Sequence, residues 1–343
     1  MVMVSLYVVL KLIFDLMTPR YIFGLALLVL VSACEEDAVI YLPSKSVPVV
    51  YAVFNDSDSI HTVHLTRSFG ARIDPKFASQ NPDSLYFHDA SVTVGFKRRG
   101  RDSWDNYLTK KVFDGSKDSG FFRYPDNQYY RLEYDLTGLI IVDSIRVQVV
   151  IPDYNSVEAK IAKIQKVRIV APMNGQQFIS LVPDKPLIFL WDQGGHAWSE
   201  FDISFEFIEE TARGFRSKWV NIQNTQYFLS PFEKYRQLAL PYGEFISLVI
   251  LQIDEDPEVL RTYFGYVRLH ILGGGSEMVE YMKYLNGFSD YNFNGYSNVS
   301  NGMGLVTSVT ENFNDSLCFD YETRQTLLNE PRLKKLKISP WDK

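Results

Sequence analysis

Apolar and polar residues alternate with a period of two through much of the chain. The segment 60–67 reads IHTVHLTR, and the same alternation returns at 90–97, 128–134 and 145–151. This period places successive side chains on opposite faces of a strand. Because Gly, Asp, Asn and Pro turns separate these segments, the pattern predicts an antiparallel β-sandwich over residues 47–158.

A second strand pattern follows a weakly helix-compatible stretch at 156–166, where we place the domain boundary. Residues 201–207 alternate strictly between apolar and polar, and apolar runs at 244–253 and 262–272 predict two longer strands. A strand that ends in Trp and an aromatic alternating strand resemble those of immunoglobulin-like or fibronectin-type sandwiches. The sequence therefore predicts a mostly β chain with a second β-sandwich domain over 159–325.

One short helix is expected inside the second domain. Residues 276–285 read SEMVEYMKYL, with apolar residues at helical spacing, Ser276 as a suitable N-cap and Gly287 just beyond the last turn. The Met and Tyr side chains of this helix are expected to contact the core. Residues 326–343 are expected to form a solvated tail.

An uncharged, mostly apolar run occupies residues 21–33 and follows Arg20. It is shorter than the roughly 20 apolar residues of a membrane-spanning helix, but it fits the apolar core of a signal peptide that ends at small residues. The residues Val-Ser-Ala before Cys34 resemble a bacterial lipobox. We therefore expect residues 1–33 to be removed and Cys34 to be lipidated, which anchors the protein to a membrane.

The first residues leave the start of this leader open. Residues 1–16 add a second apolar run that Lys11 and Asp15 interrupt, so a translation start at Met17 gives a leader of ordinary length. The alternative keeps both apolar runs as a helical hairpin in the membrane. Pro19 and the shortness of the runs argue against that hairpin.

A tether over residues 34–46 is predicted to follow the leader. Its acidic start, Glu35, Glu36 and Asp37, has two interpretations. It is either the solvated beginning of a linker or, by resemblance, the surface-export signal of Bacteroidetes-type lipoproteins. The second interpretation implies the outer face of the outer membrane.

Charge and cysteine content narrow the function classes. The chain has 35 basic and 41 acidic residues, and loss of residues 1–33 changes the formal charge from −6 to about −7. A nucleic-acid-binding protein needs a concentrated basic face, so this class is disfavoured. With Cys34 committed to lipid, Cys318 has no partner within the chain, and its alternating apolar surroundings predict a buried structural thiol.

The sequence carries no strong catalytic or metal-binding motif, since G-x-S-x-G, H-E-x-x-H and Cys-x-x-Cys patterns are all missing. His61 and His64 fall on opposite faces of a predicted strand, so they are expected to be surface or edge residues rather than ligands of one metal. A loop with Asp192, His196 and Trp198 is a candidate binding loop, because loops carry function on β-sandwiches. We therefore expect neither catalysis nor a cofactor.

Two further features bear on surface chemistry. Four Asp-Ser-aliphatic tripeptides resemble the acceptor for O-linked glycans in exported Bacteroidetes proteins, and their serines are Ser59, Ser84, Ser144 and Ser316. The aromatic content is high, with 21 Tyr, 24 Phe and 5 Trp. Most of these belong in the cores of two sandwiches, but an exposed cluster could bind glycans or a partner barrel.

The closing segment has a recognisable arrangement. The helix at 276–285 leads through a loop rich in Gly and Asn to an Asn-x-x-x-Gly-x-Gly strand start, formed by Asn298, Gly302 and Gly304. With the lipobox, the acidic tether and the Pro-Val-Val-Tyr and Val-His-Leu-Thr-Arg strands, it resembles a family of Bacteroidetes outer-membrane lipoproteins, domain of unknown function 4249. Met303 departs from that pattern. The two glycines are expected to serve the backbone rather than chemistry.

The resemblance implies location and architecture but no catalytic residues. We expect a cell-envelope lipoprotein on the cell surface, non-catalytic, that binds a ligand or assists a TonB-dependent β-barrel transporter of the outer membrane. One alternative is a structural or adhesion module. Another is a hydrolase with a site assembled from separate loops, which a deep pocket lined by two or three carboxylates would favour.

Overall fold

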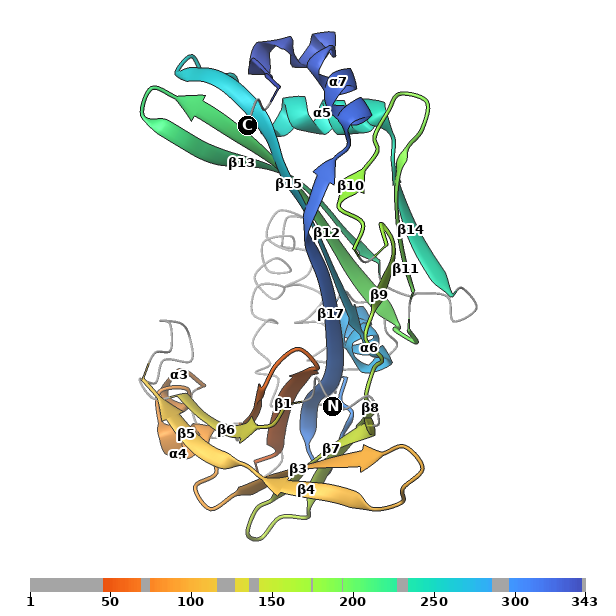
Figure 1. Ribbon diagram of the computed structural model, residues 1–343. Coiled ribbons are helices and arrows are strands. Elements are labelled where there is room, and N and C mark those ends of the chain that lie inside the picture. The colour runs from red at the N-terminus through yellow and green to blue at the C-terminus, as the bar shows by residue number, and fades with distance from the viewer. Residues whose placement is uncertain are drawn as a thin grey trace, which may run out of the picture. The chain divides into compact units, whose positions relative to one another are not determined.

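The computed structural model describes residues 46–68, 75–115, 127–135, 142–173, 175–192, 194–226, 234–285 and 296–340 (Figure 1). The predicted leader, Cys34 and the acidic residues Glu35, Glu36 and Asp37 lie outside these ranges. Among the described residues, no helix is both long and apolar enough to span a membrane.

The described chain is mostly β-structure, as the alternating pattern predicts. In chain order the strands are β1 (Pro48–Asn55), β2 (Ile60–Arg67), β3 (Ser91–Arg98), β4 (Trp104–Leu108), β5 (Lys110–Asp114), β6 (Asn127–Glu133), β7 (Val142–Val150), β8 (Val157–Ala162), β9 (Arg168–Ala171), β10 (Phe178–Ile179), β11 (Leu187–Asp192), β12 (Trp198–Thr211), β13 (Gly214–Gln226), β14 (Tyr235–Leu240), β15 (Val259–Gly274), β16 (Val299–Ser300) and β17 (Met303–Phe319). The helices are α3 (Pro75–Ala78), α4 (Pro82–Leu85), α5 (Tyr242–Gln252), α6 (Ser276–Leu285), α7 (Tyr321–Leu328) and the 3₁₀ helix η1 (Pro331–Leu336).

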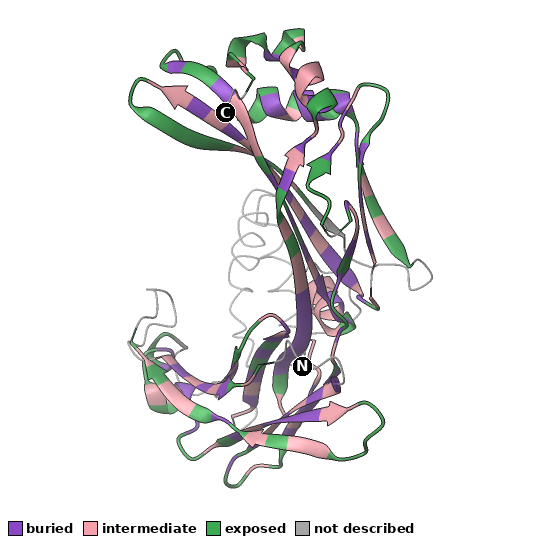
Figure 2. Cartoon of the chain, viewed as in Figure 1, coloured by how far each residue is buried: buried purple, intermediate pink, exposed green. Residues whose placement is uncertain are grey.

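A nine-stranded sheet organises the described chain. Its strand order is β13-β12-β15-β17-β1-β2-β6-β5, and β10 pairs with β17 outside this path. The other two sheets have the orders β14-β11-β9 and β16-β8-β7-β3-β4. Buried and partly exposed residues alternate along the strands, so each sheet has a core face and an outer face (Figure 2).

The first sandwich is formed by one end of the large sheet and the five-stranded sheet. Its core joins residues of β1, β2 and β6, such as Phe54 and Leu65, to residues of β3, β7 and β8, such as Phe96, Ile145 and Ile161. These side chains are the apolar positions of the alternating segments, which explains why those segments form strands with one buried face.

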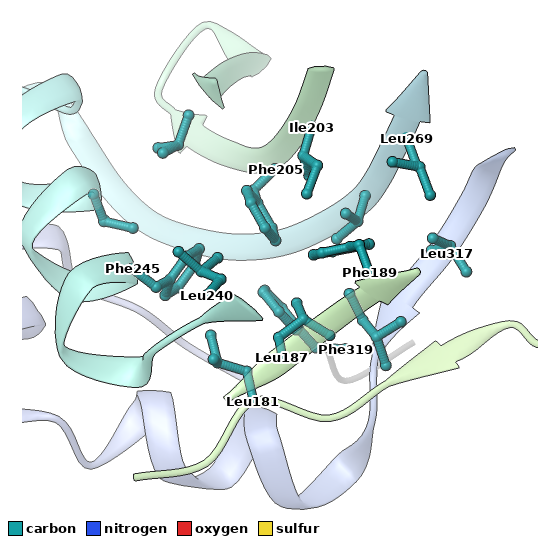
Figure 3. Close-up of a cluster of buried hydrophobic side chains, with 14 of the residues drawn as sticks. Leu181, Leu187, Phe189, Ile203, Phe205, Leu240, Phe245, Leu269, Leu317 and Phe319 are labelled. Atoms are coloured by element: carbon teal, nitrogen blue, oxygen red, sulfur yellow. The ribbon is translucent and has the colours of Figure 1, made fainter. Parts of the chain in front are cut away.

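The second sandwich is formed by the other end of the large sheet and the three-stranded sheet. Figure 3 shows Phe205 of β12, Phe189 of β11, Phe245 of α5 and Phe319 of β17 in one cluster. The rings of Phe205 and Phe319 stack with their centroids 5.7 Å apart. The β-sandwich architecture is therefore confirmed, whereas the residue limits of two domains stay a prediction.

Strand β17 contributes to both cores. It pairs in parallel with β1 and antiparallel with β15. Its residue Val306 belongs to the first core, and Leu317 and Phe319 belong to the second. The two sandwiches therefore share one continuous sheet, which short-range sequence patterns did not predict.

The helix predictions have mixed outcomes. Helix α6 occupies Ser276–Leu285, as expected. The expectation of one helix and of a strand at 244–253 is wrong, because α5 covers this run and buries Tyr242, Phe245, Ile246 and Val249 at helical spacing. The helix-compatible stretch at 156–166 contains strand β8, whose residues alternate between buried and more exposed.

Residues beyond the second predicted domain also pack on its core. Leu327 of α7 and Leu333 of η1 are almost fully buried. Asp320 caps α7 by accepting a hydrogen bond from the backbone N–H of Thr323 at 2.8 Å. The expected solvated tail is therefore, up to residue 340, partly a packed element.

Candidate functional site

The predicted modification sites lie in different surroundings. Cys34 and the export-signal residues fall outside the described ranges. Ser59 and Ser316 are exposed, while Ser84 and Ser144 are half-buried. The structure therefore leaves the hydroxyls of Ser59 and Ser316 the more accessible pair.

The candidate binding loop is largely buried. His196 and Trp198 are only 4% and 5% exposed. Nε2 of His196 lies 2.8 Å from the carbonyl oxygen of Gln165, and Asp192 accepts a hydrogen bond of 3.2 Å from Arg168. His196 and Trp198 therefore pack inside the protein and present little surface to a ligand.

His196 belongs to a polar layer, which we call the seam, on the core face of the large sheet. A Cβ on Gly273 would lie 2.7 Å from Nδ1 of His196, so the missing side chain makes room for the imidazole. Ser199 and Thr310 are the strand partners of Gly273, and both are fully buried. Their hydroxyls have no hydrogen-bond partner among the described residues.

A buried ion pair completes the seam. Nζ of Lys163, in the segment between β8 and β9, lies 3.9 Å from Oδ2 of Asp56, and both side chains are almost completely shielded from solvent. Burial lowers the pKa of Lys163, although the negative charge of Asp56 opposes this effect. The nearby chain is held by a further contact, in which the N–H of Ile164 donates to Oγ of Ser308 at 3.4 Å. The seam thus ties the segment between the sandwiches to the large sheet.

The prediction that His61 is a surface or edge residue is wrong. Its side chain is 2% exposed, its ring lies 5.6 Å from that of Phe54, and Nε2 contacts the carbonyl oxygen of Tyr134 at 3.0 Å. The alternating pattern correctly placed His61 on one face of the strand. A pattern within one strand does not show whether the rest of the protein packs against that face.

The glycine motif serves the backbone, as expected. Gly304 has φ of +122°, and a Cβ on Gly302 would lie 2.9 Å from the carbonyl oxygen of Pro48. The amide of Asn298 donates to the carbonyl oxygen of Val306 at 2.7 Å and accepts from its N–H at 3.0 Å. These residues position the start of β17 beside β1.

The outer face of the large sheet carries the best candidate site. A hollow of about 330 Å³ opens over β12, β15 and β17 and is lined by Asp202, Ser204, Arg268, Leu269, His270, Phe313 and Asp315. The strand register explains the assembly, because His270 is the direct partner of both Asp202 and Phe313. Side chains opposite one another on one face lie within contact reach.

Charge and aromatic surface are combined around this hollow. The guanidinium carbon of Arg268 lies 4.2 Å from the ring centroid of Trp219, which holds the cation in place. Oδ1 of Asp202 is shielded from solvent and accepts no hydrogen bond from the described residues. Phe313 is 65% exposed. The hollow therefore offers a fixed cation, two lining carboxylates and an open aromatic ring.

A hydrogen-bonded contact between His270 and Glu311 borders the hollow. Nε2 of His270 lies 3.0 Å from Oε2 of Glu311, and the amide of Asn55 donates to Oε1 of Glu311 at 3.1 Å. Burial alone raises the pKa of Glu311, but these hydrogen bonds outweigh it and hold the pKa below its usual value. Glu311 therefore fixes the imidazole of His270 at the edge of the hollow.

Three observations on the described residues bear on catalysis. The described residues contain no group of three or more His, Cys, Asp or Glu side chains placed to hold a metal ion. Cys318 is half-buried, so the prediction of a buried thiol is wrong. Its partial burial raises the pKa of the thiol, which disfavours the reactive thiolate. Two carboxylates, Asp202 and Asp315, line the hollow, and they are the groups a hydrolytic alternative would use.

Sequence patterns missed this site for a physical reason. Arg268, His270 and Phe313 each stand at an outward position of a strand, where a single polar or aromatic residue is ordinary. The available signal was Phe313, an aromatic residue on the polar face of β17. Only the register between strands brings it beside Asp202 and His270.

Comparison with known proteins finds only weak structural matches. No protein-family model and no curated protein match the chain. It is similar to the FN1–FN3 domains of chicken CNTN1, with 10% identity over 68% of this chain and 62% of that chain and a TM-score of 0.24. A DUF4785 family protein from Legionella pneumophila matches with 11% identity over 65% of this chain and 52% of that chain, at a TM-score of 0.21. Both matches span less than two thirds of the other chain, and such low TM-scores support no conclusion about function.

Proposed function

We propose that this protein is a non-catalytic binding lipoprotein of the cell envelope whose ligand occupies the hollow on the outer sheet face. The observation that carries the proposal is the meeting of Asp202, Arg268, His270 and Phe313 in one hollow. Donors, acceptors and an exposed ring on a rigid sheet are the elements of a ligand site.

The place of action rests on the sequence. The lipobox-like end before Cys34 supports a lipid anchor, and the acidic residues after it support the outer face of the outer membrane. The resemblance to the lipoprotein family named above supports a TonB-dependent β-barrel transporter as partner. In this proposal the sandwiches hold the ligand beside the transporter, and the tether 34–46 joins them to the membrane.

The anchor has a direct test. Cells that express the wild-type protein should incorporate radiolabelled palmitate into it, and Cys34→Ala should remove the label. Cys318→Ala is the matched control and should keep the label, because Cys318 lies in β17 and only Cys34 follows the lipobox-like residues. Label that persists in Cys34→Ala would contradict the anchor.

The binding role is tested in a deletion strain. We expect loss of growth on one nutrient and co-purification of a β-barrel protein with the acylated wild-type chain. Arg268→Gln should fail to restore growth, whereas Arg213→Gln, in the turn between β12 and β13 and outside the hollow lining, should restore it. Full nutrient use combined with a weakened envelope would instead favour a structural or adhesion module.

Hydrolysis is the second candidate, favoured by the two carboxylates in the hollow lining. A hydrolase would convert its ligand, and Asp202→Asn with Asp315→Asn would stop turnover while leaving binding measurable. Under the binding proposal, chromatography of the bound ligand should recover it unchanged after prolonged incubation.

A further inference from the structure

We propose that the ligand of the hollow is a neutral oligosaccharide that lies across the strands of the outer sheet face. This inference rests on the proposed binding function and names the chemical class of ligand. It follows from four properties of the hollow, which are its exposed ring, its hydrogen-bonding groups, its charge and its dimensions.

The exposed ring supplies an apolar platform. Phe313 lies on the outer face of β17 with 65% of its surface exposed, although its neighbours on this face are polar or charged. Large exposed aromatic rings among polar groups are typical of binding surfaces. A pyranose ring has one face made of C–H groups, and that face can stack on Phe313 while its hydroxyls remain directed to polar partners.

The hydrogen-bonding groups suit hydroxyls. A sugar hydroxyl both donates and accepts, so its best site pairs an acceptor with a donor. Asp202 and Asp315 are acceptors and Arg268 is a donor, all in the same lining, whereas Nε2 of His270 already contacts Glu311 at 3.0 Å. The side-chain amide of Gln223 donates to Oδ2 of Asp202 at 3.4 Å, which holds this carboxylate in the lining.

The charge of the hollow disfavours anionic ligands. Asp202, Asp315 and neighbouring Glu311 place three carboxylates near one fixed guanidinium, that of Arg268. Phosphates and uronic acids are repelled by this excess of carboxylates. The same balance of charges does not repel a cation, so a cationic ligand is separated from a neutral one by the binding test. A neutral ligand has no charge for these carboxylates to repel.

The dimensions fit a short chain of sugar units. The polar face continues across four strands, because Gln223 of β13 pairs with Asp202, Asp202 with His270, and His270 with Phe313. Neighbouring strands are about 4.8 Å apart, so this row is roughly 14 Å long. The hollow of about 330 Å³ is at the small end of ligand sites, and a flat row beside it can hold further units.

The test is isothermal titration calorimetry of the purified protein with gluco-, manno-, xylo- and fully N-acetylated chito-oligosaccharides, which are all neutral. We expect at least one series to bind, more tightly as the chain lengthens from two units. Phe313→Ala should weaken that binding by about tenfold or more. Phe215→Ala is the matched control, since Phe215 is 62% exposed on β13 and outside the hollow lining, and it should leave the affinity unchanged.

A second variant keeps the result interpretable. Asp202→Asn replaces one acceptor oxygen by a donor and should also weaken binding. The unfolding temperatures of both variants, measured beside that of the wild-type protein, separate a loss of binding from a loss of stability. Affinity that is unchanged in both variants, or no binding of any neutral series, would overturn the saccharide assignment.

The failure of this inference differs from failure of the proposed function. A charged oligosaccharide or a peptide that binds with the same sensitivity to Phe313→Ala and Asp202→Asn would overturn the saccharide class and leave the binding function intact. Two results together would instead overturn the binding function. The deletion strain would grow on every nutrient, and expression of the Arg268→Gln variant in it would restore the integrity of the envelope.

Discussion

Gly304 and Val50 are direct partners in the parallel pairing of β17 and β1, and a Cβ on Gly304 would lie 1.9 Å from the carbonyl oxygen of Val50. Gly304 also has φ of +122°, a conformation that other residues rarely adopt. This contact is where the last long strand of the chain meets the first. The Asn-x-x-x-Gly-x-Gly motif therefore joins distant parts of the sequence.

Replacing Gly304 by Ala should destabilise the protein severely. The new methyl group would force β17 away from β1 and strain the backbone, so we expect a loss of at least about 3 kcal/mol in the free energy of unfolding. Urea denaturation followed by tryptophan fluorescence measures it. Gly100→Ala is the control, because Gly100 has φ of +73° but no atom within 4 Å of its Cβ position, and it should cost about 1 kcal/mol. Equal losses for both variants would contradict the close approach.

The seam should be sensitive to the removal of a single charge. Lys163→Met leaves Asp56 buried without its cation, and we expect a loss of about 3 kcal/mol in the free energy of unfolding. The double variant Lys163→Met with Asp56→Asn should lose clearly less, since no isolated charge remains. A double-mutant cycle by urea denaturation tests this. Additive losses would show that the two groups do not interact.

The spacing of apolar residues within a segment predicted those strands and helices whose conformation depends mainly on that segment. The strict alternation of residues 201–207 belongs to β12, and the helical spacing in 276–285 belongs to α6. The run at 244–253 was misassigned because nearly every residue in it is apolar, so a strand and a one-sided helix give similar patterns. The capacity of α5 to bury Phe245 and Val249 depends on the second core, which no local pattern contains.

The pairing of strands that are distant in sequence limited how much of the sheet and of the site could be predicted. Val50 and Gly304 are about as far apart in sequence as any two partners of the described sheet. The sequence around either residue does not predict that the other is its partner. The same holds for Asp202, His270 and Phe313, which lie on three strands. The candidate loop at 192–198 was chosen because loops carry function, but its His196 and Trp198 fill the interior beside Gly273 and Gly274.

Two buried histidines should make the protein less stable in mild acid. Burial lowers the pKa of both His61 and His196, and this effect exceeds the opposing hydrogen bonds and carboxylates. The unfolded chain takes up protons below about pH 6.5 while the folded chain resists, so the free energy of unfolding falls as the pH drops through this value. His61→Gln and His196→Gln should each reduce that slope by up to about 1.4 kcal/mol per pH unit.

Urea denaturation at a series of pH values provides the measurement for the histidine variants. Between pH 8 and 9, both forms of the chain hold neutral histidines, so the slopes of the variants and the wild-type protein should agree there. Slopes that also agree between pH 7 and 5 would show that neither imidazole is protected from protonation in the folded state.

Glu330 should contribute to stability in a lower pH range. Hydrogen bonds from the Arg332 guanidinium bring the pKa of Glu330 to about 2, and the Tyr242 hydroxyl donates to the same carboxylate at 2.9 Å. Because this pKa is lowered, the contribution is complete above the unfolded-state value of about 4.3 and is lost as the pH falls toward 2. Glu330→Gln should lower the free energy of unfolding at pH 7 by about 1 kcal/mol and flatten its decline below pH 4.5. Arg332→Gln removes the main cause of the shift and should flatten the same decline, so an acid slope unchanged in both variants would contradict the pairing of Glu330 with Arg332.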